Sequence, residues 1–290
     1  MSSTTHPVPA PVVRDPEVLA DALVGALAGA GSVLVAFSGG ADSALVLAGA
    51  VRALGPDRVA AATAVSDAVP GAEVLAARRL ADDLGVGWHE PRTDEMAREG
   101  YRANGGDRCY FCKTELMSVL VPLAQELGLA HVATGTNADD LRAGFRPGIR
   151  AAAEVGALTP LADAGLSKAE VRALSAHWGL PTWDKPAAAC LSSRIAYGIP
   201  ITPALLHRVE RAEADVRALL GDRVRDLRVR DLGDGTARVE LDAACLESLD
   251  GAGRTAVAAA VRAHGHAEVE LRAFRSGAMN DLLAAPDRFR

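Results

Sequence analysis

Residues 33–43 read Val33-Leu34-Val35-Ala36-Phe37-Ser38-Gly39-Gly40-Ala41-Asp42-Ser43, an apolar run followed directly by a small polar loop. The apolar run predicts a buried β-strand, and the residues after the loop predict an α-helix. The two glycines permit a tight turn close to a ligand, the serines offer hydroxyl groups, and the helix N-terminus presents unpaired N–H groups. The segment therefore predicts a phosphate-binding loop.

A carboxylate in this loop, Asp42, narrows the chemistry that we expect. A negative side chain suits a phosphate site when it holds a divalent cation or steadies the loop. Asp42 therefore favours cleavage of a Mg²⁺-bound nucleotide over simple binding. The Walker A pattern Gly-x-x-x-x-Gly-Lys-Ser/Thr is absent from the sequence. The competing interpretation is ordinary turn and helix-capping chemistry, which the same residue types also provide.

Strands and helices are expected to alternate along the first part of the chain. The hydrophobic periodicity predicts helices at 16–30, 43–54, 71–84 and 116–127, and strands at 33–37, 59–65, 88–92 and 131–134. This alternation is typical of an α/β fold with a doubly wound parallel sheet, in which ligands bind at the carboxyl ends of the strands. A second polar loop, Gly135-Thr136-Asn137-Ala138-Asp139-Asp140, also follows an expected strand. We therefore expect both polar loops to border one nucleotide site.

The sequence pattern changes after Pro186. Strands are expected at 224–229 and 237–241, separated by the hairpin signal Gly233-Asp234-Gly235, followed by a helix at 246–264 and a strand at 268–274. This order predicts a smaller α+β domain with an antiparallel sheet. The predicted organisation is a disordered tail over residues 1–14, a nucleotide-cleaving domain over 15–188, and a substrate or oligomerisation domain over 189–290.

Composition limits the classes of function. The chain has 290 residues, 49% of them hydrophobic, and a formal net charge of -6, which argues against a dedicated nucleic-acid surface. Four cysteines are too few for a secreted disulfide scaffold, and the start of the chain lacks the pattern of a signal peptide. No segment is long and apolar enough to span a bilayer. We therefore expect a cytoplasmic protein that acts on a small molecule.

The cysteines suggest a second kind of chemistry. Cys109 and Cys112 form a Cys-x-x-Cys motif that we expect in a substrate-facing loop, while Lys185 and Arg194 flank Cys190 and could lower its pKa. Cys245 is expected to be a small buried thiol. A Cys-x-x-Cys motif is compatible with zinc, a redox pair or an iron–sulfur cluster. Zinc would need a fourth ligand, whereas three thiolates can hold a 4Fe-4S cluster with one iron open; a zinc knuckle or plain buried thiols remain alternatives.

Five segments together resemble the LarE-type sulfur transferases of the PP-loop, or adenine nucleotide alpha-hydrolase-like, superfamily. They are Ser38-Gly39-Gly40-Ala41-Asp42-Ser43, Asp107-Arg108-Cys109-Tyr110-Phe111-Cys112-Lys113, Gly135-Thr136-Asn137-Ala138-Asp139-Asp140, Cys190-Leu191-Ser192-Ser193-Arg194 and Arg275-Ser276-Gly277-Ala278-Met279-Asn280. The resemblance implies that ATP adenylates the carboxylates of a pyridinium dicarboxylate mononucleotide. Sulfur then converts them to thiocarboxylates for a nickel-pincer nucleotide. One branch of the family sacrifices its own cysteine, and another holds a 4Fe-4S cluster on three cysteines.

The resemblance also implies roles for individual residues. ATP phosphates and pyrophosphate are assigned to Ser38, Gly39, Gly40, Asp42 and Ser43, and the flanks of the nucleotide and acyl-adenylate to Gly135, Thr136, Asn137, Asp139, Asp140 and Lys113. Cys190 matches the donor cysteine of the sacrificial branch, but the presence of Cys109 and Cys112 makes us favour all three as cluster ligands. The implied cofactors are ATP, Mg²⁺ and a 4Fe-4S cluster, and the family tends to form trimers or hexamers.

Several positions have two interpretations. Arg194, four residues from Cys190, is a candidate for binding a substrate phosphate or carboxylate. Arg146 and Arg150 are candidates for phosphate binding or are solvated loop charges. The charged residues Glu210, Arg228, Arg230 and Glu240 either face the same cavity or form the wet face of the second sheet.

Two other classes of function remain open at this point. One is a different PP-loop adenylating enzyme, for tRNA thiolation or for amidation as in NAD and GMP synthetases, which carry the same Ser-Gly-Gly-x-Asp-Ser loop. The Cys190 segment and the block at 275–280 disfavour amidation, and the acidic balance disfavours tRNA. The other is a regulatory module that binds AMP or ATP, which Asp42 and the three cysteines disfavour.

Overall fold

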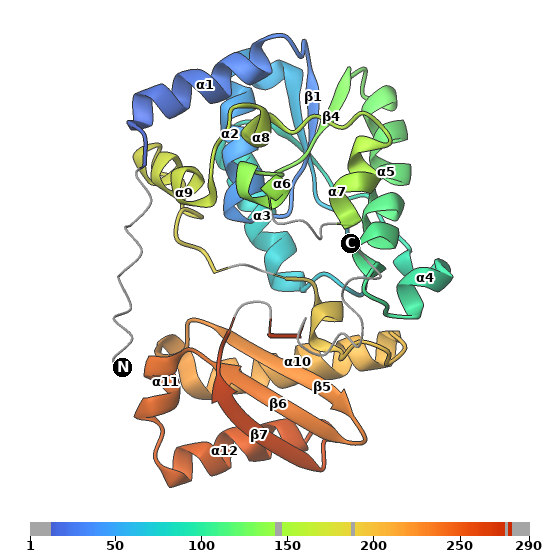
Figure 1. Cartoon of the computed structure of the whole chain (residues 1–290), viewed down its shortest axis with the longest axis vertical. Helices are drawn as coiled ribbons and strands as arrows, with labels where there is room; N and C mark the ends of the chain where they lie inside the picture. Colours follow the sequence, from blue (N-terminus) through green and yellow to red (C-terminus); the bar gives the residue numbers. More distant parts are fainter. Residues whose placement is uncertain (1–12, 143–146, 187–188, 276–277, 280–290) are drawn as a thin grey trace, which may run out of the picture.

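The computed structural model describes residues 13–142, 147–186, 189–275 and 278–279. They build two sheets, each covered by helices (Figure 1). The larger sheet has the order β3-β2-β1-β4, and every neighbouring pair is parallel. Its strands are β1 (Val33–Ala36), β2 (Val59–Ala62), β3 (Gly87–His89) and β4 (His131–Ala133). The predicted α/β fold with a parallel sheet is confirmed.

Helices pack on both faces of the larger sheet because its strands are apolar on both sides. Val33 and Val35 belong to one core cluster with residues of α1 (Pro16–Ala28), α2 (Ala41–Leu54), α3 (Gly71–Asp83) and α9 (Lys168–His177). Leu34, between them, belongs to a second cluster with Met117 and Leu120 of α5 (Arg108–Glu126). Alternate strand residues therefore bury themselves in opposite layers, as the two-residue period of a strand requires.

Helix α5 begins earlier than the sequence pattern indicates. The helix expected at 116–127 starts at Arg108, so Cys109 and Cys112 lie in its first turns, and the loop predicted for them is wrong. Phe111 and Cys112 pack against a buried cluster that contains Tyr101 and Leu191, and this apolar contact stabilises the first turns of the helix. Shorter helices not expected from the sequence are α4 (Glu99–Arg102), α6 (Ala138–Arg142), α7 (Pro147–Ala153) and α8 (Pro160–Asp163).

The smaller sheet has the order β5-β6-β7, with strands β5 (Leu227–Gly233), β6 (Thr236–Leu241) and β7 (Glu268–Ala273). The hairpin of β5 and β6 is antiparallel as predicted, but β6 and β7 pair in parallel, so the expectation of a fully antiparallel sheet is wrong. A parallel pair needs a crossover connection, which α11 (Ala243–Ser248) and α12 (Gly251–Arg262) provide in place of one continuous helix. The unexpected helix α10 (Pro203–Leu220) packs against β5. Cys245 is buried in this core, as predicted.

The segment that carries Cys190 lies between the two sheets (Figure 1). It includes the short 3₁₀ turn Leu191–Arg194, and Leu191 and Ile195 pack in one cluster with Tyr101 from the first part and Leu206 of α10. The predicted division at residues 188 and 189 stays a prediction. Residues 1–12 lie outside the described residues, whereas Arg14, assigned to the tail from the sequence, pairs with Glu170. Among the helices of the described part, none has the length and apolarity needed to cross a membrane.

Candidate active site

The polar loop after β1 has the geometry of a phosphate-binding turn. Gly39 has a φ of 68°, and a Cβ there would lie 3.2 Å from the Cβ of Ala77, so both the conformation and the space favour glycine. Helix α2 starts at Ala41, so the N–H groups of its first turn point into the loop. The Ser43 hydroxyl donates to the Gly40 carbonyl at 3.2 Å and accepts from the Ser38 N–H at 3.3 Å, which closes the turn on itself.

The loop after β4 lies against the start of α2, as predicted. A Cβ on Gly135 would lie 2.9 Å from the Ser43 backbone nitrogen, so the two loops approach closely enough to require a glycine. Asn137, which is 4% exposed, donates from Nδ2 to Asp42 Oδ1 at 3.1 Å. The other carboxylate oxygen of Asp42 accepts from the Lys168 ammonium at the start of α9, a partner that the sequence analysis did not identify.

A cavity of about 400 Å³ opens where these loops meet. This volume lies in the range of small-molecule sites, and the cavity lies at the carboxyl ends of β1, β2 and β4, where α/β proteins bind ligands. Of the predicted site residues, its walls include Ser38, Gly40, Asp42, Ser43, Lys113, Gly135, Thr136, Cys112 and Cys190. Phosphate-loop residues and two thiols therefore face one space.

The thiols share the cavity with acidic and basic side chains. Burial raises the pKa of the Cys112 thiol, and the neighbouring Cys190, Glu95 and Cys109 raise it further. Glu95 is 6% exposed, lines the same cavity, and accepts a hydrogen bond from the Thr93 hydroxyl at 2.9 Å. Burial lowers the pKa of the Lys113 ammonium, and the Cys112 and Cys109 thiols oppose this shift.

The three cysteines predicted as cluster ligands carry the soft donors that an iron–sulfur cluster uses, but the described structure does not group them as a metal site. Cys112 and Cys190 line the cavity, and Cys109 lies three residues before Cys112 on α5, a spacing that puts both on one helix face. Soft thiolate donors suit iron–sulfur clusters, and binding would require Cys112 to release its proton. Among the described residues no three His, Cys, Asp or Glu side chains are grouped closely enough to hold a metal ion.

Lys185 binds the phosphate loop rather than the Cys190 thiol that the sequence analysis paired it with. Its ammonium donates to the Gly39 carbonyl at 3.0 Å and to Glu73 Oε2 at 2.6 Å. Glu73 lines the cavity. A half-buried lysine and glutamate therefore support the loop from the side of α3, and neither contact has a local sequence signal because the partners lie in distant segments.

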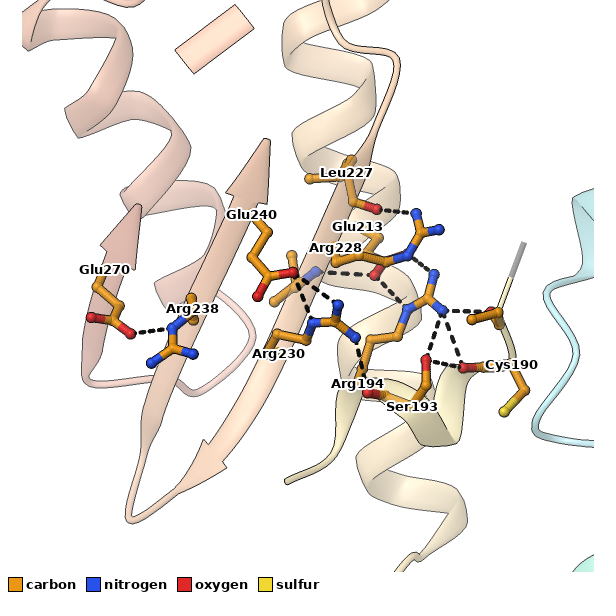
Figure 2. A network of polar contacts seen from close by, with 12 residues as sticks. Cys190, Ser193, Arg194, Glu213, Leu227, Arg228, Arg230, Arg238, Glu240 and Glu270 are labelled. Atoms are coloured by element: carbon orange, nitrogen blue, oxygen red, sulfur yellow. Dashed lines mark hydrogen bonds and ion pairs between the residues drawn. The ribbon is translucent and has the colours of Figure 1, made fainter. Parts of the chain in front are cut away.

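Arg194 lies in a polar network with Cys190, Glu213 and Arg230 (Figure 2). Its guanidinium pairs with both oxygens of Glu213, at 2.8 and 3.1 Å, and donates to the Cys190 carbonyl at 3.1 Å. The residue is 3% exposed and is absent from the cavity walls. In this geometry its donors are directed at protein acceptors, and its binding of a substrate phosphate or carboxylate stays a prediction.

The remaining charges of this network are held inside the protein as well. Arg230, 5% exposed, donates to Glu240 Oε2 at 2.8 Å and to the Ser193 carbonyl at 2.9 Å. Burial is the main cause that lowers the pKa of Arg228 to about 10, and the positive charge of Arg194 lowers it further. The interpretation of Arg228, Arg230 and Glu240 as a wet strand face is therefore wrong, because all three are buried.

Several predicted residues do not line the cavity. Gly39, Asn137 and Cys109 are absent from its lining. Asp139 is exposed and accepts from the backbone N–H of Lys168 at 2.8 Å, whereas Asp140 lines the cavity. Arg150 is exposed and pairs with Glu154. Arg146 and residues 276, 277 and 280 lie outside the described residues.

Comparison with known proteins gives relatives over most of the chain. The family model for NAD synthase matches residues 19–194. A pyridinium-3,5-bisthiocarboxylic acid mononucleotide synthase from Lactiplantibacillus plantarum is 36% identical over 265 residues, which cover 90% of this chain and 93% of that protein. An uncharacterised protein from Synechocystis sp. is 48% identical over 208 residues, which cover 72% of this chain and 75% of that protein.

Proposed function

This chain belongs to the PP-loop superfamily and, within it, to the family of LarE-type pyridinium-3,5-bisthiocarboxylic acid mononucleotide synthases. We propose that it is an ATP-dependent sulfur transferase. Its substrate is pyridinium-3,5-biscarboxylic acid mononucleotide, whose carboxylates it adenylates and converts to thiocarboxylates. The observation that carries the proposal is the shared cavity. It is lined both by residues of the phosphate loop, such as Ser38 and Asp42, which we call the phosphate wall, and by Cys112 and Cys190, which we call the thiol wall.

The first step uses the phosphate wall. A substrate carboxylate oxygen attacks the α-phosphate of ATP, the bond to the β-phosphate breaks, and pyrophosphate leaves. The loop of Gly39 and Gly40 and the first turn of α2 supply N–H donors for the released pyrophosphate. Asp42 is the group we assign to Mg²⁺, and Lys168, now paired with Asp42, is then available to the phosphates.

The second step uses the thiol wall. A sulfur nucleophile attacks the acyl carbon of the adenylate, the carbon–oxygen bond to AMP breaks, and AMP leaves with the electron pair. We favour Cys109, Cys112 and Cys190 as ligands of a 4Fe-4S cluster, which when bound would supply sulfide and leave the protein unchanged. In the alternative, the Cys190 thiolate attacks directly; loss of its Cα proton then breaks the Cβ–sulfur bond, which leaves sulfur on the substrate and dehydroalanine in the chain.

The test is an anaerobic incubation of the purified protein with ATP, Mg²⁺ and the pyridinium dicarboxylate mononucleotide. We expect AMP, pyrophosphate and thiocarboxylate, each followed by chromatography and mass spectrometry. Iron content and intact protein mass distinguish the two sulfur routes: unchanged mass with about four irons per chain supports the cluster, and loss of the mass of hydrogen sulfide at Cys190 supports the sacrificial route. AMP and pyrophosphate without thiocarboxylate would contradict the proposal.

The NAD synthase match supports a second candidate, an amide-forming adenylating enzyme. The Cys190→Ala variant separates the two, because amidation by ammonia has no need of that thiol, whereas sulfur transfer should stop. Cys245→Ala is the matched control, since Cys245 is buried in the core of the smaller sheet and should not affect either reaction. Equal product formation by Cys190→Ala and wild type would favour amidation.

A further inference from the structure

The backbone around Cys190 is held by arginine side chains rather than by a regular sheet or a long helix. The Arg194 guanidinium donates to the carbonyls of Ala189 and Cys190, the second at 3.1 Å, and the Ser193 hydroxyl donates to the same Cys190 carbonyl at 2.8 Å. These contacts fix the peptide that follows the reactive residue while its thiol lines the cavity. The orientation of Cys190 therefore depends on where the guanidinium lies.

Glu213 on α10 determines that position. Its two carboxylate oxygens accept from Arg194 Nε at 2.8 Å and from a terminal nitrogen at 3.1 Å, which is the bidentate geometry that fixes a guanidinium in a plane. The first of these oxygens also accepts from the Val229 backbone N–H of β5 at 3.0 Å. Glu213 is thus tied to the smaller sheet, and the side chains in the pair are 4% and 14% exposed.

A second set of contacts holds the other side of the same segment. Arg108 of α5 donates to the Ser192 carbonyl at 3.0 Å, and Tyr101 shares a hydrogen bond with the Ser192 hydroxyl. Asn104 donates to the Ala196 carbonyl at 2.8 Å. The segment is therefore held by the larger α/β part on one side, whereas the Arg194–Glu213 pair connects it to α10 and β5 on the other (Figure 2).

We propose that Glu213, acting through Arg194, holds the Cys190 thiol against the cavity, so that both are positioning residues for the sulfur-transfer step. This inference rests on the proposed function. It gives Arg194 a different role from that of a substrate ligand, because its guanidinium donates to Glu213, to the carbonyls of Ala189 and Cys190, and to the Ser193 hydroxyl. Adenylation takes place at the phosphate wall and does not involve the pair.

The experiment compares two rates in the Glu213→Gln variant of the full-length protein. The amide keeps the size of the side chain but places an N–H₂ group against one guanidinium donor, so the bidentate pair is lost. We expect ATP–pyrophosphate exchange in the presence of substrate to stay near the wild-type rate, and thiocarboxylate formation to fall by about tenfold or more, since small misplacements of a reacting group are costly. Arg194→Lys, which keeps the charge without the planar fork, should show the same split.

Arg238→Gln is the matched control, because Arg238 pairs with Glu270 across β6 and β7 and is a comparable ion pair of the same sheet. It should change neither rate. Thermal unfolding identifies a variant that fails to fold. If either Glu213→Gln or Arg194→Lys does so, the inference is tested on the two rates of the other. Equal loss of exchange and transfer, or loss of neither, would overturn the inference.

A readout independent of the substrate distinguishes failure of this inference from failure of the proposed function. The rate of iodoacetamide modification, mapped by peptide mass spectrometry, should change about tenfold at Cys190 in Glu213→Gln and Arg194→Lys, and it should stay the same at exposed Cys109. If wild type makes no thiocarboxylate but Cys190 modification changes, only the proposed function fails. Unchanged modification of Cys190 would refute the positioning role in either case.

Discussion

The two walls of the cavity are built in different ways. The phosphate wall comes largely from one continuous stretch, in which β1, the loop at Gly39 and the first turn of α2 follow one another. The thiol wall joins Cys112 of α5 to Cys190, and buried contacts from Arg108 and Arg194 hold the Cys190 segment in place. The shape of the phosphate wall depends mainly on local backbone geometry, whereas thiol placement depends on side chains from distant parts of the chain.

The strongest test of the thiol wall is removal of each cysteine in turn. If the three thiols act together, Cys109→Ala and Cys112→Ala should abolish repeated thiocarboxylate formation as completely as Cys190→Ala does. The physical reason is that a cluster held by three thiolates loses a ligand in each variant. The measurement is thiocarboxylate formed per protein chain under anaerobic conditions, and Cys245→Ala serves as the control. Activity that survives in Cys109→Ala and Cys112→Ala would instead support the sacrificial route.

The strongest test of the phosphate wall is Asp42→Asn. If Asp42 holds Mg²⁺, losing the carboxylate should slow AMP formation by at least about a hundredfold, because a metal ion contributes several kcal/mol to the transition state. Stability should change by less than about 1 kcal/mol, since the pair with Lys168 is partly exposed. Chromatographic measurement of AMP and denaturant unfolding check the two parts. Asp57→Asn, on an exposed turn, is the control and should leave AMP formation unchanged.

Gly135→Ala tests the close approach of the two polar loops. The added Cβ would lie 2.9 Å from the Ser43 nitrogen and 3.1 Å from the Asp42 carbonyl carbon, both backbone atoms that must move. We expect a loss of about 1–3 kcal/mol in unfolding free energy and a raised KM for ATP. Gly25→Ala, in α1, is the comparison, because a Cβ added there would meet no neighbouring side chain or segment within 4 Å. It should instead stabilise the protein by about 0.5–1 kcal/mol. Similar effects of the two substitutions would show that the loops do not depend on this contact.

The strand, loop and helix of the phosphate wall were predicted correctly because their determinants are adjacent in the sequence. An apolar strand, two glycines and a helix start follow one another, and the second loop was found by its place after β4. Pairing of β6 with β7 was predicted wrongly because strand direction depends on the path of the connection, which periodicity does not report.

The thiol wall was predicted only in its cysteines. The contacts of Arg194 with Glu213 and of Lys185 with Glu73 join residues far apart in the sequence, and a single charged residue carries no signal of its partner. Lys168 was missed for the same reason: it reaches Asp42 only because α9 packs beside α2. Burial of Arg230 and Glu240 was also missed, because alternating charges on a strand usually indicate a solvated face.

The smallest expected effect is on stability, and it concerns the start of α9, which places Lys168 beside Asp42. Ser167 and Glu170 form a capping box at the start of α9, and the hydrogen bond from Arg14 is the main cause that lowers the pKa of Glu170 to about 2, from 4.5. A lowered carboxylate pKa stabilises the fold above the unfolded value, and this stabilisation is lost as the pH falls from 4.5 towards 2.

Glu170→Gln keeps a side chain suited to the capping box but removes the charge. At neutral pH it should reduce the unfolding free energy by about 1–2 kcal/mol, a value discounted for the exposed Arg14, and the difference from wild type should vanish near pH 2. Denaturant unfolding across this pH range is the measurement, with Glu17→Gln, whose side chain is 76% exposed, as the control. A difference that persists unchanged at low pH would mean that the charge of Glu170 does not stabilise α9, and the placement of Lys168 would then depend on helix packing alone.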